Sequence, residues 1–332
     1  MSKPSYGVQM SGVGSAVPDA RLTNQDLEKM FETSDEWIVT RTGIRERRIV
    51  DQPTEGTYTL SVEAAQRAVD DAGIDPSTID LLINATVSAE MTCPSNGCRV
   101  AAAIGAVPAA AFDLVAACSG FVYSLNVADP LIRSGLYKRI MVIGCDCMST
   151  LIDYEDRGVS ILFGDAAGAV LLERDEDPKR GSLYQSMQAD GSQWPCLYIP
   201  RRENEVCANP ATDNIELGKL RMIGREVYKF AVPKLVEIID AALKETGMTA
   251  DQIDHFVCHQ SNARIIESAI AKLELPADRV HMNIEYYGNS SAGSVGLCLD
   301  DLWRASKVKK GDVVLFIAVG GGLTWAVNMW RV

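Results

Sequence analysis

A long internal repeat constrains the fold of this chain more than any other feature of its sequence. Residues 68–83 resemble residues 242–257. Each segment is typical of a helix that ends at a glycine, followed by a short polar connection with an Ile-Asp pair and then an apolar strand. The two glycines, Gly73 and Gly247, are the residue type that ends helices in the left-handed conformation. The chain is therefore predicted to contain two copies of one helix-strand unit.

The repeat continues downstream of both copies. A Ser-Asn pair precedes a predicted helix over residues 99–104 and another over residues 264–270. The apolar strand at 139–144 has its counterpart at 312–317. Strands that alternate with helices are typical of βαβ units and of largely parallel sheets covered on both faces. The sequence predicts an α/β fold made of two pseudo-symmetric βαβ-type halves.

Polar, turn-rich sequence separates the two copies. Residues 175–181 and 201–205 are rich in charged and turn-forming side chains. We place the N-terminal half at residues 1–175 and the C-terminal half at residues 176–332. Ligands in duplicated α/β folds collect outside the carboxyl ends of the strands. Polar residues at strand ends in both halves are thus candidates for one shared site.

The net charge of −12 argues against nucleic acid as a general partner, because phosphate binding needs clustered Lys and Arg. No apolar run approaches the roughly 20 residues of a membrane span, and residues 1–7 lack a signal-peptide pattern. Nine scattered cysteines favour reduced thiols and a cytoplasmic protein. No metal is predicted, since only three histidines and no second Cys-x-x-Cys accompany the loosely spaced cysteine pairs Cys93/Cys98 and Cys145/Cys147.

Cys118 is the candidate nucleophile. It follows a predicted strand and stands where a helix of small residues begins. At a helix N-terminus, unpaired amides and the helix dipole stabilise a thiolate, so we expect a lowered thiol pKa. The alternative for this residue is a buried structural thiol.

Two further polar residues are candidates for the same site. His259 ends the apolar run 256–258 and is followed by polar residues, which favours an acid–base role, whereas His255 and His281 are expected to be structural. Asn289 occupies the place in the second half that Cys118 has in the first. Its alternative role is a turn or helix cap.

Two glycine-containing segments differ in what they predict. Residues 320–322 are three glycines after an apolar strand, and such a segment lets a backbone amide approach a ligand as an oxyanion donor. The alternative is a tight turn between two strands. Residues 12–14 follow a short strand but lack the third glycine of a dinucleotide-binding motif, so we predict a turn there.

Seven motifs, in this order and spread over essentially the whole chain, resemble those of the β-ketoacyl-acyl carrier protein synthase III family. These condensing enzymes start type II fatty acid synthesis and belong to the thiolase superfamily. The motifs are residues 33–47, Ala117-Cys118-Ser119-Gly120, Asp156-Arg157-Gly158, Phe163-Gly164-Asp165, residues 259–265, residues 288–292 and residues 320–325.

The resemblance implies a thiolase-like fold with layered α-β-α-β-α architecture. It implies that Cys118 accepts the acyl group and that His259 and Asn289 serve the malonyl half-reaction. The backbone amides of Cys118 and Gly321 would form the oxyanion hole. Neutral His259 and Asn289 would each donate a hydrogen bond to the thioester oxygen of the enolate, each worth ~3 kcal/mol by analogy with oxyanion-hole deletions.

The resemblance also implies the substrates and partners. Trp37 and Arg157 would sandwich the adenine of coenzyme A, with Arg41 near its phosphates, and Arg264 would contact the acidic acyl carrier protein. The coenzyme A thioester is a substrate, so no cofactor is expected. The family is dimeric, which implies a homodimer. The implied reaction is the decarboxylative condensation of an acyl-CoA primer with malonyl-acyl carrier protein.

Two residues depart from the family pattern. Pro130 lies inside the helix expected after Cys118, and an interior proline costs ~3 kcal/mol and should kink or end that helix. Cys93 stands where the family often has a bulky residue that limits primer length. We hypothesise from this smaller side chain a primer pocket that accepts a longer or broader chain than acetyl.

Alternatives remain open at this point. The chain could be an acyltransferase or a specialised secondary-metabolite ketosynthase that uses the same Cys118. It could also be a non-catalytic homologue that only binds a carrier protein, although such a homologue is expected to lose the nucleophile. A thiolase would need a second cysteine near the C-terminal glycines, and elongating ketosynthases use two histidines.

Overall fold

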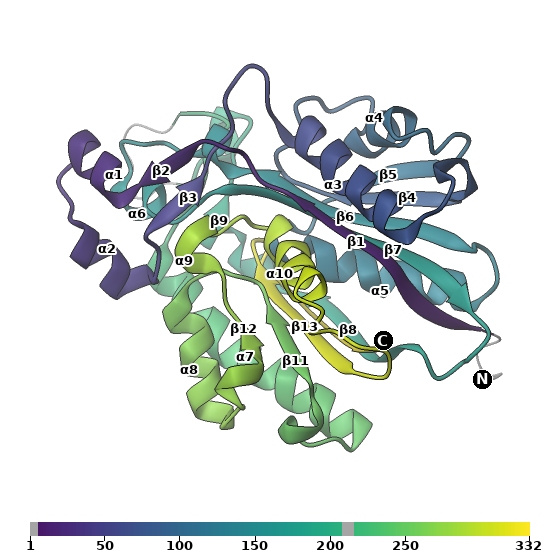
Figure 1. The fold of residues 1–332 in the computed structure, drawn as a ribbon. Helices are drawn as coiled ribbons and strands as arrows, with labels where there is room; N and C mark the ends of the chain where they lie inside the picture. Colours follow the sequence, from purple (N-terminus) through teal and green to yellow (C-terminus); the bar gives the residue numbers. More distant parts are fainter. Residues whose placement is uncertain (1–5, 208–215) are drawn as a thin grey trace.

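Two five-stranded sheets form the centre of the protein (Figure 1). The computed structural model describes residues 6–207 and 216–332. The first sheet has the order β1-β7-β6-β4-β5, with β1 (Gly7–Ala16), β4 (Leu81–Ala85), β5 (Ala110–Leu114), β6 (Arg139–Cys147) and β7 (Asp165–Asp175). The second has the order β8-β14-β13-β11-β12, with β8 (Gly181–Ala189), β11 (His255–Cys258), β12 (Val280–His281), β13 (Val313–Gly320) and β14 (Thr324–Arg331).

Helices and two small ribbons complete the described chain. The helices are α1 (Asn24–Met30), α2 (Asp35–Thr42), α3 (Thr57–Ala72), α4 (Asn96–Ala103), α5 (Gly120–Arg133), α6 (Arg157–Ser160), α7 (Gly224–Thr246), α8 (Ala263–Leu273), α9 (Ile284–Tyr287) and α10 (Gly293–Arg304). The ribbons pair β2 (Arg21–Thr23) with β3 (Glu46–Arg48), and β9 (Leu197–Tyr198) with β10 (Arg221–Met222). No helix among residues 6–207 and 216–332 is long and apolar enough to cross a membrane.

The two sheets share one topology, and this confirms the repeat. In each sheet the corresponding strands occur in the same spatial order and with the same directions. Gly73 and Gly247 end α3 and α7 with φ of 64° and 67°, the left-handed conformation predicted for both. The β7 strand ends at Asp175 and β8 begins at Gly181, so the strands of one sheet precede those of the other. The division into 1–175 and 176–332 stays a prediction.

The expectation of largely parallel sheets is wrong. Each sheet has two parallel and two antiparallel pairings; β4 runs parallel to β5 and β6, whereas β7 runs antiparallel to β1 and β6. In the second sheet, β14 corresponds to β7 and runs antiparallel to both of its neighbours, β13 and β8. Only residues 321–323 separate β13 from β14, and so short a connection permits antiparallel pairing alone.

The sheets and helices stack in five layers, as the α-β-α-β-α prediction requires. Helices α5 and α10 lie between the two sheets, where Phe121 and Val295 share one apolar core with Val142 of the first sheet and Phe316 of the second. Helices α3 and α4 cover the outer face of the first sheet. Helices α7 and α8 cover the outer face of the second.

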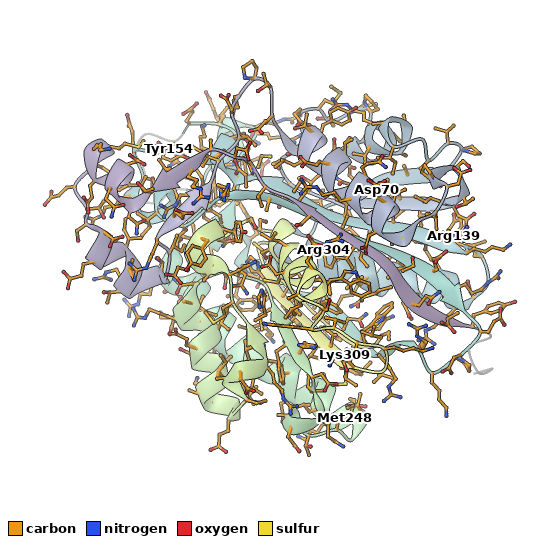
Figure 2. All side chains as sticks on the ribbon, viewed as in Figure 1. Asp70, Arg139, Tyr154, Met248, Arg304 and Lys309 are labelled. Atoms are coloured by element: carbon orange, nitrogen blue, oxygen red, sulfur yellow. The ribbon has the colours of Figure 1, made fainter. Side chains whose placement is uncertain are left out.

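Polar contacts also tie the central layer to the first half. Arg304 lies at the end of α10 (Figure 2). It ion-pairs with Asp71 of α3 at 2.7 Å and donates to the carbonyl of Val13 in β1. The α10 helix begins at Gly293, four residues after Asn289, and these contacts hold its C-terminal end against the half that carries Cys118.

Pro130 does not end its helix, which corrects one part of the sequence expectation. The α5 helix continues for three residues beyond it, to Arg133. A proline at this position leaves the carbonyl of Asn126 without its helical amide partner. The Nε2 of Gln185, in the neighbouring strand β8, donates to that carbonyl at 3.3 Å. The lost helical bond is thereby replaced by a tertiary one.

Candidate active site

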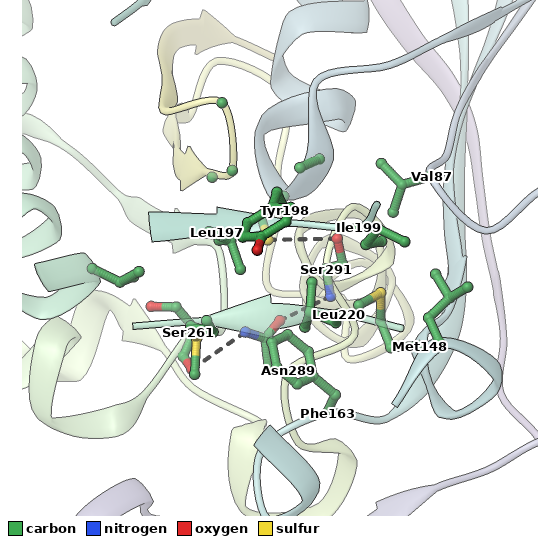
Figure 3. Close-up of a pocket in the computed structure, with 18 of the residues that line it drawn as sticks. Val87, Met148, Phe163, Leu197, Tyr198, Ile199, Leu220, Ser261, Asn289 and Ser291 are labelled. Atoms are coloured by element: carbon green, nitrogen blue, oxygen red, sulfur yellow. Dashed lines mark hydrogen bonds between the residues drawn. The ribbon is translucent and has the colours of Figure 1, made fainter. Parts of the chain in front are cut away.

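A cavity of about 1010 Å³ lies between the two halves, and the three catalytic candidates line it together. Cys118 comes from the first half, and His259 and Asn289 come from the second. Much of the wall beside them is apolar (Figure 3) and includes Val87, Met148, Phe163, Leu197, Ile199 and Leu220. The convergence predicted from the repeat is present in the structure.

Cys118 lies on a short 3₁₀ turn, Ala117–Ser119, between β5 and α5. Its side chain is buried, and the hydroxyl of Ser291 donates to Sγ at 3.5 Å. A Cβ atom on Gly320 would stand only 2.9 Å from the amide nitrogen of Cys118. Glycine at this position is therefore needed for β13 to approach the cysteine turn so closely.

Burial raises the pKa of the Cys118 thiol to about 11, which corrects the expectation of a lowered value. The nearby Asp146 carboxylate also raises it. Hydrogen bonds from Ser291 and from the amides of Cys118 and Gly321 lower the pKa, but they do not offset the loss of water around the sulfur. The resting site therefore holds a thiol.

This raised pKa predicts slow alkylation of Cys118 by iodoacetamide at neutral pH. Only the thiolate reacts, so the rate should rise about tenfold per pH unit between about pH 6 and about pH 9. Peptide mapping would follow Cys118 separately from the exposed Cys93 and Cys98. A rate that levels off near pH 9 would show instead that the thiol has its ordinary pKa, and a rate that levels off near neutral pH would show that its pKa is lowered.

His259 is buried and follows the last residue of β11. Its Nδ1 lies 2.7 Å from the hydroxyl oxygen of Ser294. Its Nε2 has no hydrogen-bond partner in the described chain. Burial lowers the pKa of this imidazole to about 3, so the ring is neutral at neutral pH. The other two histidines lie outside the cavity wall, His255 beside Asp312 at 3.5 Å and His281 beside Asp301 at 3.2 Å.

Two hydrogen bonds orient the carboxamide of Asn289, which lines the cavity. Its Oδ1 accepts from the backbone amide of Ser291 at 2.9 Å, and its Nδ2 donates to the carbonyl of Ser261 at 3.5 Å (Figure 3). These partners fix which end of the carboxamide is the donor. Nδ2 keeps a second hydrogen for a ligand. The hydrogen bond to Ser291 joins residues two positions apart and stabilises the turn, as the alternative role predicted. Asn289 also lines the cavity, so its side chain is placed to contact a ligand there.

Asp146 supports this site, and we did not single it out from the sequence. It lies near the end of β6, is fully buried, and accepts from the amides of Val87 at 2.8 Å and Ala292 at 3.2 Å. It thus joins the loop after β4 to the segment that carries Asn289. Burial raises the pKa of its carboxyl group. The available signal was a lone carboxylate at the end of a continuous apolar strand.

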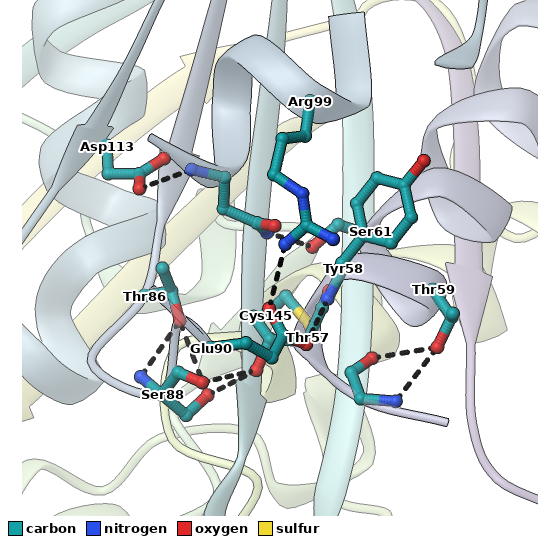
Figure 4. Close-up of polar contacts among 12 residues, drawn as sticks. Thr57, Tyr58, Thr59, Ser61, Thr86, Ser88, Glu90, Arg99, Asp113 and Cys145 are labelled. Carbon is teal, nitrogen blue, oxygen red and sulfur yellow. Dashed lines mark hydrogen bonds and ion pairs between the residues drawn. The ribbon is translucent and has the colours of Figure 1, made fainter. Parts of the chain in front are cut away.

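Polar contacts also hold the cavity-lining loop at residues 86–92 (Figure 4). The Glu90 carboxylate accepts from the amide of Tyr58 at 2.8 Å, in the first turn of α3, where the helix dipole favours negative charge. The Thr57 hydroxyl donates to the carbonyl of Ser88 at 2.8 Å. This wall of the cavity is therefore anchored to a long helix.

The residues expected to bind coenzyme A lie together on α2 and α6. The guanidinium carbons of Arg41 and Arg157 lie 4.6 and 4.8 Å from the centre of the Trp37 ring. Arg41 lines the cavity, and Arg157 also donates to the carbonyl of Glu32 at 3.0 Å. An adenine between Trp37 and Arg157 would have to displace this arginine from the ring.

The remaining two candidates lie outside the cavity wall. Cys93 is exposed and does not line the cavity of the single chain, although its neighbours Met91 and Thr92 do. Arg264 is exposed at the start of α8, two residues after Asn262, which lines the cavity.

Comparison with known proteins identifies relatives over nearly the whole chain. Residues 112–191 and 243–332 match the family models for 3-oxoacyl-[acyl-carrier-protein] synthase III and for its C-terminal region. The β-ketoacyl-[acyl-carrier-protein] synthase III of Caldanaerobacter subterraneus subsp. tengcongensis is 44% identical over 96% of both chains.

Solved structures agree with the sequence comparison. The 3-oxoacyl-[acyl-carrier-protein] synthase III of Aquifex aeolicus is similar with a TM-score of 0.90 and 40% identity, covering 98% of this chain and 100% of that one. The priming β-ketosynthase of the R1128 polyketide pathway is similar with a TM-score of 0.91 and 32% identity, covering 100% and 98%. The chain thus has the thiolase fold and belongs to the 3-oxoacyl-[acyl-carrier-protein] synthase III family of acyl-transferring condensing enzymes.

Proposed function

We propose that this enzyme condenses an acyl-CoA primer with malonyl-acyl carrier protein, releasing CO2 and forming a 3-oxoacyl-acyl carrier protein that initiates type II fatty acid synthesis. The observation that carries the proposal is the meeting of Cys118, His259 and Asn289 at one cavity between the halves. Each supplies a group that this reaction needs: a nucleophile, an imidazole and an amide donor. The proposed chemistry requires no metal and no redox cofactor.

In the first half-reaction, the Cys118 sulfur attacks the thioester carbonyl of the primer. The new oxyanion is stabilised by the backbone amides of Cys118 and Gly321, both of which already hydrogen-bond at the sulfur position. Coenzyme A leaves as a thiol and carries away the proton of the cysteine. The acyl chain is then received by the apolar wall that includes Met148, Leu197 and Leu220.

In the second half-reaction, the malonyl thioester loses CO2 and becomes an enolate. The free hydrogen of Asn289 Nδ2 is available for the enolate oxygen, and His259 lies in the same cavity wall. The enolate carbon attacks the acyl group on Cys118, and the 3-oxoacyl product leaves the cysteine. Donors fixed before the reaction are effective here because they need no reorganisation as charge develops.

The substrate contacts follow the same proposal. Arg41 and Arg157 stand at Trp37, where two cations beside an aromatic ring suit the adenine and phosphates of coenzyme A. Arg264 places an exposed positive charge near the cavity residue Asn262, which suits an acidic carrier protein. On a chain of net charge −12, such local cations decide where an acidic partner can dock.

The proposal is tested by incubating the purified enzyme with a panel of acyl-CoA primers and malonyl-acyl carrier protein labelled in its free carboxyl group. We expect an acyl adduct, labelled CO2 and a 3-oxoacyl product. Acylation without CO2 release would favour an acyltransferase instead. The absence of any acyl adduct would favour a carrier-protein-binding homologue. Preference for acetyl-CoA over medium-chain primers would refute the hypothesis of a wide primer pocket based on Cys93.

A specialised ketosynthase remains the second candidate. It is favoured by one observation, the similarity to the priming β-ketosynthase of a polyketide pathway. The two candidates share the chemistry at Cys118 and differ in the carrier protein that they accept. Comparing fatty acid and polyketide carrier proteins in the condensation assay separates them.

We further propose that the enzyme is a cytoplasmic homodimer. All nine cysteines lie in the described chain and all are free thiols, which suits a reducing compartment. Strand β5 is at the edge of the first sheet, and Phe112 in it, Val107 before it and Val115 after it are exposed by 40%, 61% and 77%. An exposed strand edge with apolar side chains is a natural surface for a second copy.

Replacing Phe112 with glutamate is expected to convert the dimer to monomers. The added charge would have to be buried in the apolar contact, which costs several kcal/mol when the charge is unpaired. Sedimentation velocity measures the result. The control is Leu136→Glu, at a residue 65% exposed in the loop between α5 and β6, which should stay dimeric. An unaltered dimer in the Phe112→Glu variant would exclude this edge as the interface.

A further inference from the structure

The side chain of Gln260 makes four hydrogen bonds, each to a backbone group. Its Nε2 donates to the carbonyls of Cys258 at 2.9 Å and His281 at 3.3 Å. Its Oε1 accepts from the amides of Asn283 at 3.1 Å and Ile284 at 3.2 Å. A carboxamide has two hydrogens to donate and two lone pairs that accept. The full capacity of this side chain, which has no exposed surface, is therefore used.

Gln260 lies between two residues of the cavity wall. His259 and Ser261 flank it and line the cavity, whereas Gln260 itself is not among the described residues of that wall. Its bond to the carbonyl of Cys258 holds the end of β11, and His259 is the next residue. Gln260 can therefore act on the site only through the backbone that carries His259.

The oxygen of the same carboxamide holds the segment that leads to Asn289. Ile284 begins α9, and its carbonyl accepts from the amide of Gly288 at 2.9 Å. Asn289 follows Gly288 directly. The direct hydrogen bond from Asn289 Nδ2 to the carbonyl of Ser261 is long, at 3.5 Å, and therefore weak. The shorter bonds of Gln260 are a firmer connection between the two segments.

We propose that Gln260 is a positioning residue that sets the separation of His259 and Asn289 for the malonyl half-reaction. This inference rests on the proposed condensation, in which both side chains serve the oxygen of one enolate. Two groups that serve a single atom must keep a fixed spacing, and a misplacement of about 1 Å can cost about 10²-fold in rate. Acylation uses the backbone amides of Cys118 and Gly321 instead, so it should not depend on Gln260.

The Gln260→Glu variant tests this role, because it keeps the size of the side chain and removes its donors. An ionised carboxylate still accepts from the two amides at one oxygen, but its other oxygen faces two carbonyls. Burial and these carbonyls both favour the neutral acid, so the pKa of the introduced carboxyl should lie above its usual value. The neutral acid keeps one donor for a carbonyl and loses it as the pH rises.

We expect the rate of CO2 release by Gln260→Glu, divided by that of the original enzyme, to fall at least tenfold between about pH 6 and about pH 9. Acylation of Cys118 should stay within about twofold of the original rate over this range. Labelled CO2 from malonyl-acyl carrier protein measures the first rate, and mass spectrometry of the acyl adduct measures the second. Intact acylation also shows that the variant is folded.

Other titratable groups near Gln260 are the same in both enzymes. Those adjoining its contacts are Cys258, His259, His281, Glu285, Cys298 and Asp301. Their titration contributes to the rates of the variant and of the original enzyme alike. The ratio of the two rates at each pH therefore reports the introduced carboxyl.

The matched control is Gln185→Glu in strand β8. Nε2 of Gln185 also donates to a backbone carbonyl, that of Asn126 at 3.3 Å, and its Oε1 accepts from Asn328 at 3.5 Å. Gln185 is not among the described residues of the cavity wall. We expect the ratio of CO2 release to acylation in this variant to match that of the original enzyme at every pH.

Two results would overturn the positioning role of Gln260. One is a parallel loss of acylation and CO2 release in the Gln260→Glu variant, which would mark a general loss of structure. The other is a rate of CO2 release that keeps a constant ratio to the original rate across the pH range. If the original enzyme forms no acyl adduct or releases no CO2, it is the proposed function that fails.

Discussion

The Cys118→Ala variant is expected to form no acyl adduct with any acyl-CoA and to lose condensation by roughly 10⁴-fold or more, as removal of a nucleophile does elsewhere. Cys118 is the cysteine that lines the cavity with His259 and Asn289. Its sulfur is also where two backbone amides and the Ser291 hydroxyl converge. Among the described residues that line the cavity, Cys118 is the one with a thiol that can attack the thioester. Intact-protein mass spectrometry after incubation with acyl-CoA measures the adduct directly.

A cysteine outside the cavity provides the control. Cys98 is exposed in the first turn of α4, where its thiol contacts the carbonyl of Ala111 at 3.6 Å. The Cys98→Ala variant should acylate as the original enzyme does, and this shows that exposed thiols do not account for the mass shift. A persistent adduct on the Cys118→Ala variant would refute the assignment of the nucleophile.

The His259→Ala variant is expected to keep acylation and to lose condensation by about 10²- to 10³-fold. Nε2 of His259 has no protein partner in the described chain and is not bonded to the Cys118 sulfur in the resting enzyme. The imidazole is therefore not required to hold the thiol in place. Under the proposed mechanism it acts in the half-reaction where the enolate oxygen develops charge.

Two separate measurements distinguish the two half-reactions in the His259→Ala variant. Mass spectrometry follows the acyl adduct, and release of labelled CO2 from malonyl-acyl carrier protein follows the second half-reaction. The control is His255→Gln, because His255 lies at the far end of β11 beside Asp312 and outside the cavity wall. Equal loss of acylation and CO2 release in the His259→Ala variant would instead make His259 the base for Cys118.

Much of the fold followed from local patterns that have a direct physical cause. Gly73 and Gly247 were predicted to end helices because glycine tolerates the left-handed conformation, and both do so. The apolar strands predicted sheets buried on both faces, and the repeat predicted that Cys118 and His259 would meet. The directions of the strands could not be predicted from such local patterns. The direction of β7 and β14 depends on which neighbour each strand joins, and composition alone does not carry that information.

Pro130 shows how a tertiary contact changes a local expectation. The sequence identified the cost of an interior proline but not the Gln185 side chain that replaces the lost bond at Asn126. These residues are more than fifty positions apart, in a helix and a strand that meet only in the folded protein.

By itself, the sequence determined the residue types of the site, their positions at strand ends and the two-fold plan of the chain, because each of these depends on local pattern and on the repeat. The tertiary structure alone decided the chemical state of the site. Burial of the side chain raises the Cys118 pKa and lowers the His259 pKa, and the His259 ring contacts a serine thirty-five residues away in another element. Desolvation and hydrogen-bond partners are properties of three-dimensional surroundings, so no local pattern predicts them.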